Sequence, residues 1–434
     1  MARELVIVGA GKIGRGVAGM LFARDGWKLH LYDPYAEGMR QLGAQGYYDV
    51  RITDGRDVDD TIRVSEFDIV DSTEPNALVD LISRLDVVTC CVYEGAFRSI
   101  AGAIAKAVRR RARAGETGQK DASCRSLNVL LCVNALGAPA RVRGYVEEAL
   151  GDDAAVRAYL DSQVGICQVM VLAAGMPSED GANPWRVVVS ANPGLEIDAD
   201  AWRGAQIEVP GISYVHGAQA HIFRKVYCGN MRHAMAGFMG KRRGLPYICD
   251  CNRDPEIRSN IVRAFREAHE AILAEYVGEF DVAEDAEWVA FLDAKLDADT
   301  KDPVDRVIDK TAEKLSHDNR FVGPALMCVH HGITPFYLTR GAAYGLRCLA
   351  AETDRNPQEA GEIRAFASEV CSLAVEGGVV SCSEEIKPEA TAVSSRSAGG
   401  VVGSDISADR LVLDLIVAHF EDIMEKEKRE GVCV

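Results

Sequence analysis

The segment from Lys225 to His233 places three side chains that can handle a hydroxyl proton within nine residues. A lysine amine can accept the proton, an asparagine amide can hold the oxygen, and an imidazole can orient the group. Oxidation of an alcohol needs these functions together with a hydride acceptor. In a helix, Asn230 and His233 are neighbours, and Lys225 lies within about 80° of His233 around the axis. The three residues are predicted to border one cavity; alternatively, each is an ordinary solvated or packed helix residue.

The start of the chain has the pattern of a nucleotide-binding loop, which would supply that acceptor. The apolar run 5–8 has strand length, and it leads into Gly9-Ala10-Gly11-Lys12-Ile13-Gly14 and then a helical pattern. The first glycine allows a tight turn, the second lets the backbone approach a pyrophosphate, and the third permits close packing of helix on strand. A chance glycine turn would not require a strand before it and a helix after it.

A second strand, residues 28–32, ends at Asp33, 19 residues beyond Gly14. A carboxylate at this distance binds the ribose 2′-hydroxyl of a dinucleotide. It would repel a 2′-phosphate, so NAD is favoured over NADP as the cofactor. The predicted cofactor-binding residues are Gly9, Gly11, Lys12, Ile13, Gly14, Asp33 and Val92.

Further apolar runs at 86–92 and 128–133 predict two more buried parallel strands. Ligands of doubly wound sheets bind beyond the carboxyl ends of the strands, so Asn134 is a candidate site residue or else a turn former. Strand-like pieces at 185–189 and 205–209 are assigned to the same domain. From 216 the pattern becomes one of long amphipathic helices. The predicted fold is α/β, with a Rossmann-type doubly wound domain (residues 1–215) followed by a mainly α-helical domain (216–434). Residues 379–404 are predicted as a surface loop, with a mobile lid as the alternative.

Composition restricts the classes of partner. The net charge of −16 argues against nucleic-acid and anionic-membrane partners, which select basic surfaces. The 13 cysteines form no CxxC pair and lie mostly in apolar runs, which is typical of reduced thiols and not of a zinc site. Without a signal-peptide pattern or a long apolar span, a cytoplasmic location is expected. The expected partner is a small molecule, and the protein is expected to be a monomer or a small homo-oligomer.

The Lys–x4–Asn–x2–His spacing resembles the signature of the polyol-specific long-chain dehydrogenases. The loop Gly9 to Gly16, the segment 302–307 and the segment 319–324 are also similar to members of that family, and the resemblance extends over roughly residues 4–350. It implies a Rossmann domain with a helical domain, NAD as cofactor and no metal. The implied reaction is oxidation of a secondary alcohol of a polyol or polyol phosphate to the ketose form, and the reverse.

The resemblance also implies a role for each matching residue. Lys225 is the general base, and a lysine must be buried or placed beside another cation to titrate near ~7–8 instead of ~10.4. Asn230 is expected to stabilise charge developing on the substrate oxygen, His233 to orient the substrate, and Asn134 to share in holding the oxygen. The chain departs from the family pattern at Val133, at 172–174 and at His216, where relatives carry acidic or other polar residues. These departures leave the carbon skeleton of the substrate open.

Four basic residues, Arg306, Lys310, Lys314 and Arg320, are predicted to form a phosphate clamp. The first three are spaced four apart and are predicted to share one helical face, which is alternatively a solvated basic face. Other functions stay open: an oxidoreductase acting on an aldonate (sugar acid), a β-hydroxyacid dehydrogenase, or an NAD-binding sensor without catalytic activity. In the β-hydroxyacid enzymes the lysine and asparagine are four residues apart and not five, which favours the polyol class.

Overall fold

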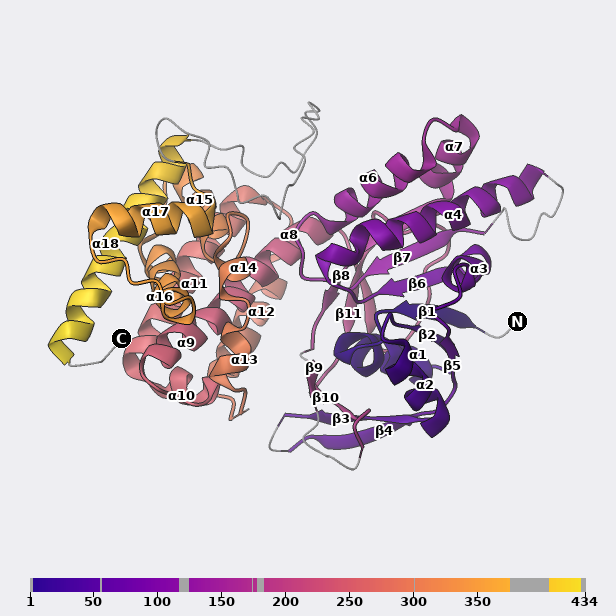
Figure 1. Ribbon diagram of the computed structural model, residues 1–434, viewed down its shortest axis with the longest axis horizontal. Coiled ribbons are helices and arrows are strands. Elements are labelled where there is room, and N and C mark those ends of the chain that lie inside the picture. The colour runs from indigo at the N-terminus through magenta and orange to yellow at the C-terminus, as the bar shows by residue number, and fades with distance from the viewer. Residues whose placement is uncertain are drawn as a thin grey trace. The chain divides into compact units, whose positions relative to one another are not determined.

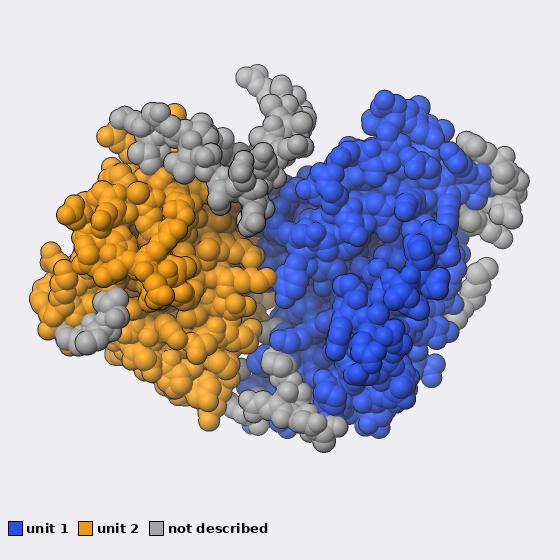
Figure 2. Space-filling view, in the orientation of Figure 1, with its two compact units in different colours: residues 1–219 blue, residues 220–434 orange. Residues whose placement is uncertain are grey.

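The computed structural model describes residues 3–54, 57–116, 125–173, 175–177, 183–299, 301–374 and 406–430. The predicted loop at 379–404 lies outside these residues. The chain divides into two compact units, residues 1–219 and 220–434 (Figure 2). None of the helices in the described part of the chain combines the length and the apolar character that a bilayer span requires.

The first unit is built on an eight-stranded sheet (Figure 1). In sheet order its strands are β12 (Ile212–Val215), β11 (Leu195–Asp198), β8 (Val164–Val171), β7 (Leu127–Leu131), β6 (Val87–Cys90), β1 (Glu4–Val8), β2 (Lys28–Tyr32) and β5 (Phe67–Val70). The six strands from β8 to β5 run parallel, whereas β11 is antiparallel to β8. The order β5-β2-β1-β6-β7-β8 is that of a doubly wound dinucleotide-binding sheet. The predicted fold class of this unit is confirmed.

Both faces of the sheet are covered, which is why its strands read as continuous apolar runs. Leu5 and Ile7 of β1 belong to one core cluster, and Val6 and Val8 belong to the other. The helices of this unit are η1 (Gly14–Gly19), α1 (Met20–Arg24), α2 (Ala36–Gln45), α3 (Ala77–Arg84), η2 (Glu94–Ala96), α4 (Phe97–Glu116), α6 (Ala138–Leu150) and α7 (Ala154–Gln163). Helices α3, α4, α6 and α7 contribute to the Val6 side.

A second sheet of four strands covers part of the Leu5 side. Its order is β4 (Asp59–Val64), β3 (Tyr48–Thr53), β10 (Val187–Ser190) and β9 (Gly175–Pro177). The predicted strand at 185–189 is therefore present, shifted slightly, as β10. The predicted strand at 205–209 is wrong: the Ile207 N–H and C=O both bond the Tyr214 hydroxyl instead of a neighbouring strand.

The second unit is helical, as predicted. It contains η3 (Lys225–Asn230), α9 (Met231–Arg242), α10 (Ile248–Arg253), α11 (Pro255–Glu275), α12 (Val282–Leu296), α13 (Val304–Ile308), α14 (Thr311–Leu315), α15 (Val322–His330), α16 (Phe336–Glu352), α17 (Ala360–Cys371) and α18 (Ile406–Glu430), and α8 (Ala218–Arg224) leads into it. Helix α16 packs against α9, α11 and α18. At Gly341 an added Cβ would lie 2.5 Å from both Met235 and Phe321, so glycine permits the close approach of α16.

Candidate functional site

The loop after β1 has the geometry of a phosphate-binding turn. Gly9 has φ +89°, and a Cβ there would lie 2.4 Å from the Cys91 carbonyl oxygen. A Cβ on Gly14 would lie 2.1 Å from the Gly9 carbonyl oxygen, so only glycine allows the helix to start this close to the strand. At Gly11 no atom of the described residues lies within 4 Å of the same position. The space above the middle glycine is what a pyrophosphate approaching the backbone would need.

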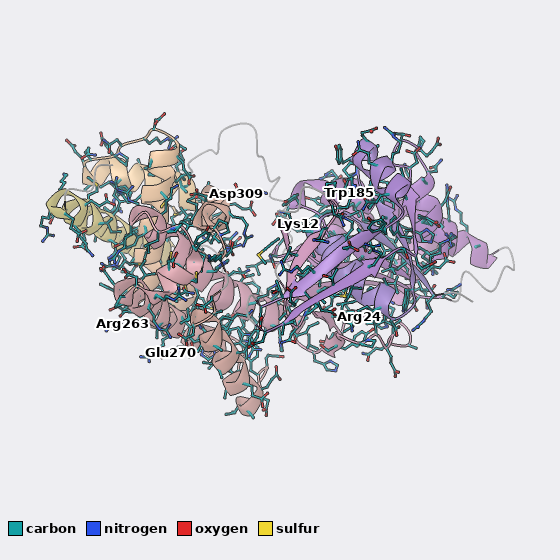
Figure 3. The ribbon with its side chains drawn as sticks, turned by 90° about the horizontal axis from the view of Figure 1, so that it is seen from below. Lys12, Arg24, Trp185, Arg263, Glu270 and Asp309 are labelled. Atoms are coloured by element: carbon teal, nitrogen blue, oxygen red, sulfur yellow. The ribbon has the colours of Figure 1, made fainter. Side chains whose placement is uncertain are left out.

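Arg15 fixes this loop and was not assigned a role from the sequence. Its side chain is buried, its Nε donates to the Ala10 carbonyl at 2.6 Å, and its Nη1 donates to the Trp185 carbonyl at 2.7 Å. The guanidinium also lies over the rings of Tyr48 and Trp185. Burial lowers the pKa of Arg15 from its ordinary value. In the sequence, an arginine at the start of an otherwise apolar helix could have indicated this role. Figure 3 labels Trp185, whose carbonyl accepts from Arg15, and Lys12 of the same loop.

The other predicted cofactor residues lie at the ends of the strands that flank β1. Asp33 directly follows β2, and its Oδ1 accepts the Tyr35 N–H at 3.0 Å. Val92 follows β6, and its Cγ1 lies 2.9 Å from the position of a Cβ on Gly9. Lys12 and Ile13 occupy the turn between β1 and η1, where Lys12 is exposed. The residues chosen from the sequence for one cofactor therefore come from adjacent strand ends of one sheet.

Asn134 lies beyond the carboxyl end of β7 and is exposed. The Gln168 side chain of β8 donates to the carbonyl of the preceding residue, Val133, at 3.1 Å. This buried hydrogen bond holds the segment that carries Asn134. Asn134 belongs to the first unit, whereas Lys225, Asn230 and His233 belong to the second.

In the second unit, the predicted trio forms one accessible stripe. Among residues 221–240, only Lys225, Gly229, Asn230 and His233 are partly exposed, and all others are buried. A helix that is buried on every other side is not a solvated surface helix. Of its side chains, the only ones that solvent or a ligand reaches are the three that the sequence singled out for chemistry. At Gly229 an added Cβ would meet only Leu292, at 3.9 Å, so the middle of the stripe is open.

The stripe depends on an unusual helical turn. Residues Lys225–Asn230 are π-helical, and α-helical geometry resumes at Met231. In a π-helix the backbone bonds run from i to i+5, so residues five apart lie near one another along the axis. In an α-helix, five residues would separate Lys225 and Asn230 by about 140° around the axis. The wider turn therefore brings the lysine and the asparagine to one face.

Asn230 has an unused donor. Its Nδ2 is buried and has no hydrogen-bond partner among the described residues. A buried amide donor without a partner costs roughly 1–3 kcal/mol, so it is expected to have one in the working protein. Because Nδ2 is itself buried, the amide has to turn toward the accessible side of the stripe before a substrate oxygen can accept its hydrogen bond.

His233 is held by a carboxylate from a distant segment. Its Nε2 lies 3.1 Å from Oδ2 of Asp302, and the Arg306 Nε donates to the other carboxylate oxygen at 2.6 Å. Burial alone would raise the pKa of Asp302, but the hydrogen bonds from His233 and Arg306 outweigh burial and lower it to about 2. Asp302 therefore stays ionised and fixes the ring, which leaves Nδ1 of His233 for a substrate.

The four basic residues do not share one helical face. Helix α13 ends at Ile308, Lys310 has φ +56°, and α14 begins at Thr311, whose hydroxyl bonds the Ile308 carbonyl at 2.7 Å. This break makes the prediction of a continuous basic face wrong. Arg306 is engaged by Asp302, and Lys310 Nζ lies 4.0 Å from Glu313.

Lys314 and Arg320 differ from the other two. Both are partly buried, and neither side chain makes a hydrogen bond or ion pair within the described residues. Burial, assisted by the nearby charge of Arg320, lowers the pKa of Lys314 to about 8. Burial also lowers the pKa of Arg320 to about 10. The carboxylates of Asp309 and Glu313 act on these cations without forming an ion pair with them, and burial still lowers both pKa values. Two such neighbouring cations could receive an anion.

Comparison with known proteins agrees with this geometry. Residues 3–189 match the family model of the mannitol dehydrogenase Rossmann domain. This region is therefore similar to the Rossmann domain of the mannitol dehydrogenases. The predicted resemblance to a polyol dehydrogenase family is thereby confirmed for the domain that holds the glycine loop.

Solved structures show that the fold of the whole chain, including the helical unit, is also found in polyol dehydrogenases. The mannitol 2-dehydrogenase of Pseudomonas fluorescens, in a ternary complex with NAD and D-mannitol, matches with a TM-score of 0.68 at 14% identity, covering 100% of this chain and 93% of that one. A substrate-free D-sorbitol dehydrogenase matches with a TM-score of 0.61 at 13% identity, covering 80% and 81%. At these identities the matches show a shared fold.

Proposed function

We propose that the protein is an NAD-dependent dehydrogenase that interconverts a secondary alcohol of a polyol or polyol phosphate with the corresponding ketone. The accessible stripe of Lys225, Gly229, Asn230 and His233 carries this proposal. It offers a proton acceptor, an oxygen ligand and an orienting imidazole on one face of an otherwise buried helix. The match of residues 3–189 to the mannitol dehydrogenase Rossmann domain supports a dinucleotide as the cofactor.

NAD is the proposed cofactor, and it would accept the hydride from the carbinol carbon. Gly9, Gly11 and Gly14 would leave its pyrophosphate room at the backbone, and Asp33 would bind a ribose hydroxyl. The carboxylate of Asp33 disfavours the 2′-phosphate of NADP. The similar mannitol 2-dehydrogenase was solved with NAD, which supports the same choice here.

In the proposed mechanism, the Lys225 amine takes the hydroxyl proton as the carbon–hydrogen bond breaks. The Asn230 amide donates to the substrate oxygen, whose negative charge grows during the reaction. His233, held at Nε2 by Asp302, binds a substrate hydroxyl through Nδ1. In the reverse direction Lys225 returns the proton to the ketone oxygen. The role of Asn134 in holding the oxygen stays a prediction.

Lys314 and Arg320 support an anionic substrate. A phosphate or a carboxylate would give both partly buried cations a counter-ion, and a guanidinium binds either group in bidentate fashion. A hexitol phosphate of the mannitol-1-phosphate type fits this pair and the hydroxyl chemistry of the stripe. An aldonate is the second candidate, because its carboxylate would occupy the same pair.

A substrate panel tests the proposal. Purified protein is assayed for NADH formation with polyols, polyol phosphates and aldonates, and in the reverse direction with ketoses and their phosphates. Turnover with a polyol phosphate is expected, and Lys225→Ala should reduce kcat by roughly 10²- to 10⁴-fold, the usual contribution of a general base. NADH binding, measured by fluorescence, should change little in this variant. Cofactor binding without turnover on any compound would instead identify an NAD-binding sensor.

A further inference from the structure

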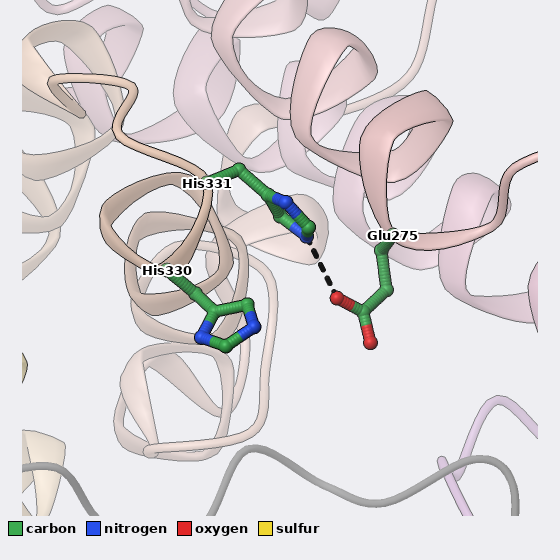
Figure 4. A group of neighbouring side chains, drawn as sticks. All are labelled: Glu275, His330 and His331. Atoms are coloured by element: carbon green, nitrogen blue, oxygen red, sulfur yellow. Dashed lines mark hydrogen bonds and ion pairs between the residues drawn. The ribbon is translucent and has the colours of Figure 1, made fainter.

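A second group of side chains that can bind a ligand lies where the C-terminal ends of two helices of the second unit meet. Glu275 is the last residue of α11, and His330 and His331 lie at the end of α15 (Figure 4). His331 Nε2 lies 2.7 Å from a Glu275 carboxylate oxygen. The two imidazole rings stand at 86° with centroids 5.0 Å apart. One ligand atom from each residue lies within 4.8 Å of the other two.

The surroundings of this group favour a cation. Helices α11 and α15 pack against each other and both end here. The last carbonyls of a helix give its C-terminus a partial negative charge, equivalent to roughly half an elementary charge. Two such ends and one carboxylate therefore act on the same small volume.

The group is separate from the catalytic stripe. Helix α15 begins near the stripe segment, because a Cβ on Gly323 would lie 2.3 Å from the Tyr227 hydroxyl. The histidines are at the other end of that helix, roughly 10 Å farther along at about 1.5 Å per residue. None of the three residues has a part in the hydride and proton transfer described above.

We propose that Glu275, His330 and His331 form a metal site that takes a divalent transition metal such as Zn²⁺. Two imidazoles and one carboxylate are a ligand set that Zn²⁺ accepts, with a water in the fourth position. Zinc ligands lie about 2.0–2.2 Å from the ion, so the exposed His330 ring turns inward on binding. The ion would connect the ends of α11 and α15 and stabilise the folded unit, since it binds the assembled ligands only.

The test uses the full-length protein, treated with a chelator and then titrated with Zn²⁺ alone in a calorimeter. One equivalent is expected to bind, and the midpoint temperature of thermal unfolding should rise with Zn²⁺. Glu275→Gln and His330→Ala should each weaken binding at least 10-fold and abolish the rise. His216→Ala is the matched control, because His216 is an exposed histidine with a single carboxylate partner, Asp200. This control should bind like the wild type.

Co²⁺ provides the second measurement, because thiolate ligands give strong near-ultraviolet absorption that imidazole and carboxylate ligands do not. Absorption without thiolate bands, lost in His330→Ala, supports the site. Thiolate bands, unchanged binding in His330→Ala, or the absence of binding would each overturn it. Equal unfolding temperatures of wild type and variants in chelator show that the substitutions do not themselves disturb the fold. Dehydrogenase turnover in chelator is expected to match that of untreated protein, so the two proposals fail independently.

Discussion

His233 is oriented by a residue 69 positions away in the chain. Asp302 is only 8% exposed; its Oδ2 binds the His233 imidazole, and both of its carboxylate oxygens accept hydrogen bonds from the Arg306 guanidinium. Because the Asp302 carboxylate is largely buried and accepts hydrogen bonds from both His233 and Arg306, the imidazole of His233 has a fixed orientation before any substrate binds. Such preorganisation lowers the barrier of a reaction by avoiding reorganisation during it.

Asp302→Asn tests this arrangement. An amide offers one acceptor and one donor, so either His233 or Arg306 loses its partner. Hydrogen bonds to charged groups contribute about 1.5–3 kcal/mol, so kcat/KM for the polyol should fall roughly 10- to 100-fold. Steady-state kinetics and NADH fluorescence measure the two effects, and cofactor affinity should stay unchanged. Asp305→Asn, which removes an exposed partner of Lys241, is the control; equal activities of the two variants would refute a positioning role for Asp302.

The stripe shows what sequence can reveal about single residues. Lys225, Asn230 and His233 were identifiable because their chemistry and spacing are both local. Asp302 was not, because a contact across 69 residues leaves no local pattern. Arg15 was likewise missed as a loop brace, since its acceptors are backbone carbonyls, which carry no sequence signal.

At the scale of elements, the first turn of α16 binds a partly buried carboxylate. Glu267 of α11 accepts the backbone N–H groups of Tyr337 and Leu338 at 2.9–3.0 Å, which satisfies free donors of that helix. Burial nevertheless raises the pKa of Glu267 from about 4.5 to about 7, and the backbone hydrogen bonds only partly offset this. The folded protein therefore holds this proton over a pH range in which the unfolded chain releases it.

The resulting pH dependence has a definite sign. Between pH 4.5 and 7 the folded state binds more protons at this group, so Glu267 should reduce the free energy of unfolding as the pH rises through that window. The size is on the order of 1–3 kcal/mol. Glu267→Gln should flatten this part of the profile, measured by urea unfolding at several pH values. A profile equally steep in wild type and variant would exclude Glu267 as its source.

The elements themselves were predictable to different degrees. Parallel strands such as β1 and β2 are evident from the sequence because burial on both faces gives continuous apolar runs. The segment 205–209 has the same appearance, but the Tyr214 hydroxyl takes its backbone groups. The break at Lys310 between α13 and α14 was hidden for a related reason, since the Thr311 hydroxyl replaces a helical hydrogen bond. Hydrogen bonds between a side chain and the backbone that replace those of a strand or helix cannot be recognised from the hydrophobic periodicity of the sequence.

At the scale of the whole molecule, each unit has its own core, and the end of the described chain belongs to the core of the second. Helix α18 packs on α16 and buries Val412, Ile416 and Phe420. Near its end Glu427 accepts hydrogen bonds from Arg242 of α9 and Arg347 of α16, each at 2.6 Å. The carboxylate is 7% exposed, so the three helices meet at a buried ion cluster.

Removing this carboxylate should destabilise the second unit. Glu427→Ala leaves the buried guanidinium of Arg347 and the partly buried one of Arg242 without their counter-charge, and breaking a buried ion pair typically costs about 3–5 kcal/mol. The unfolding transition of this unit should move to lower denaturant concentration. Glu425→Ala, which removes a surface partner of Arg429, is the matched control. A loss no larger than in the control would show that solvent replaces the missing charge.

The π-helical turn at Lys225–Asn230 changes how the lysine–asparagine spacing should be compared between enzyme families. A separation of four residues in an α-helix and one of five in a π-helix both complete about one turn. A four-residue spacing on an α-helix would therefore be equivalent in turns to the five-residue spacing of this π-helix, so the spacing alone does not separate the polyol class from the β-hydroxyacid class. The lysine–asparagine separation should therefore be compared in helical turns and not in residues. Removing a single residue within 226–229 should restore α-helical winding with the lysine and asparagine still about one turn apart, because Asn230 and the residues after it would shift by one position relative to Lys225.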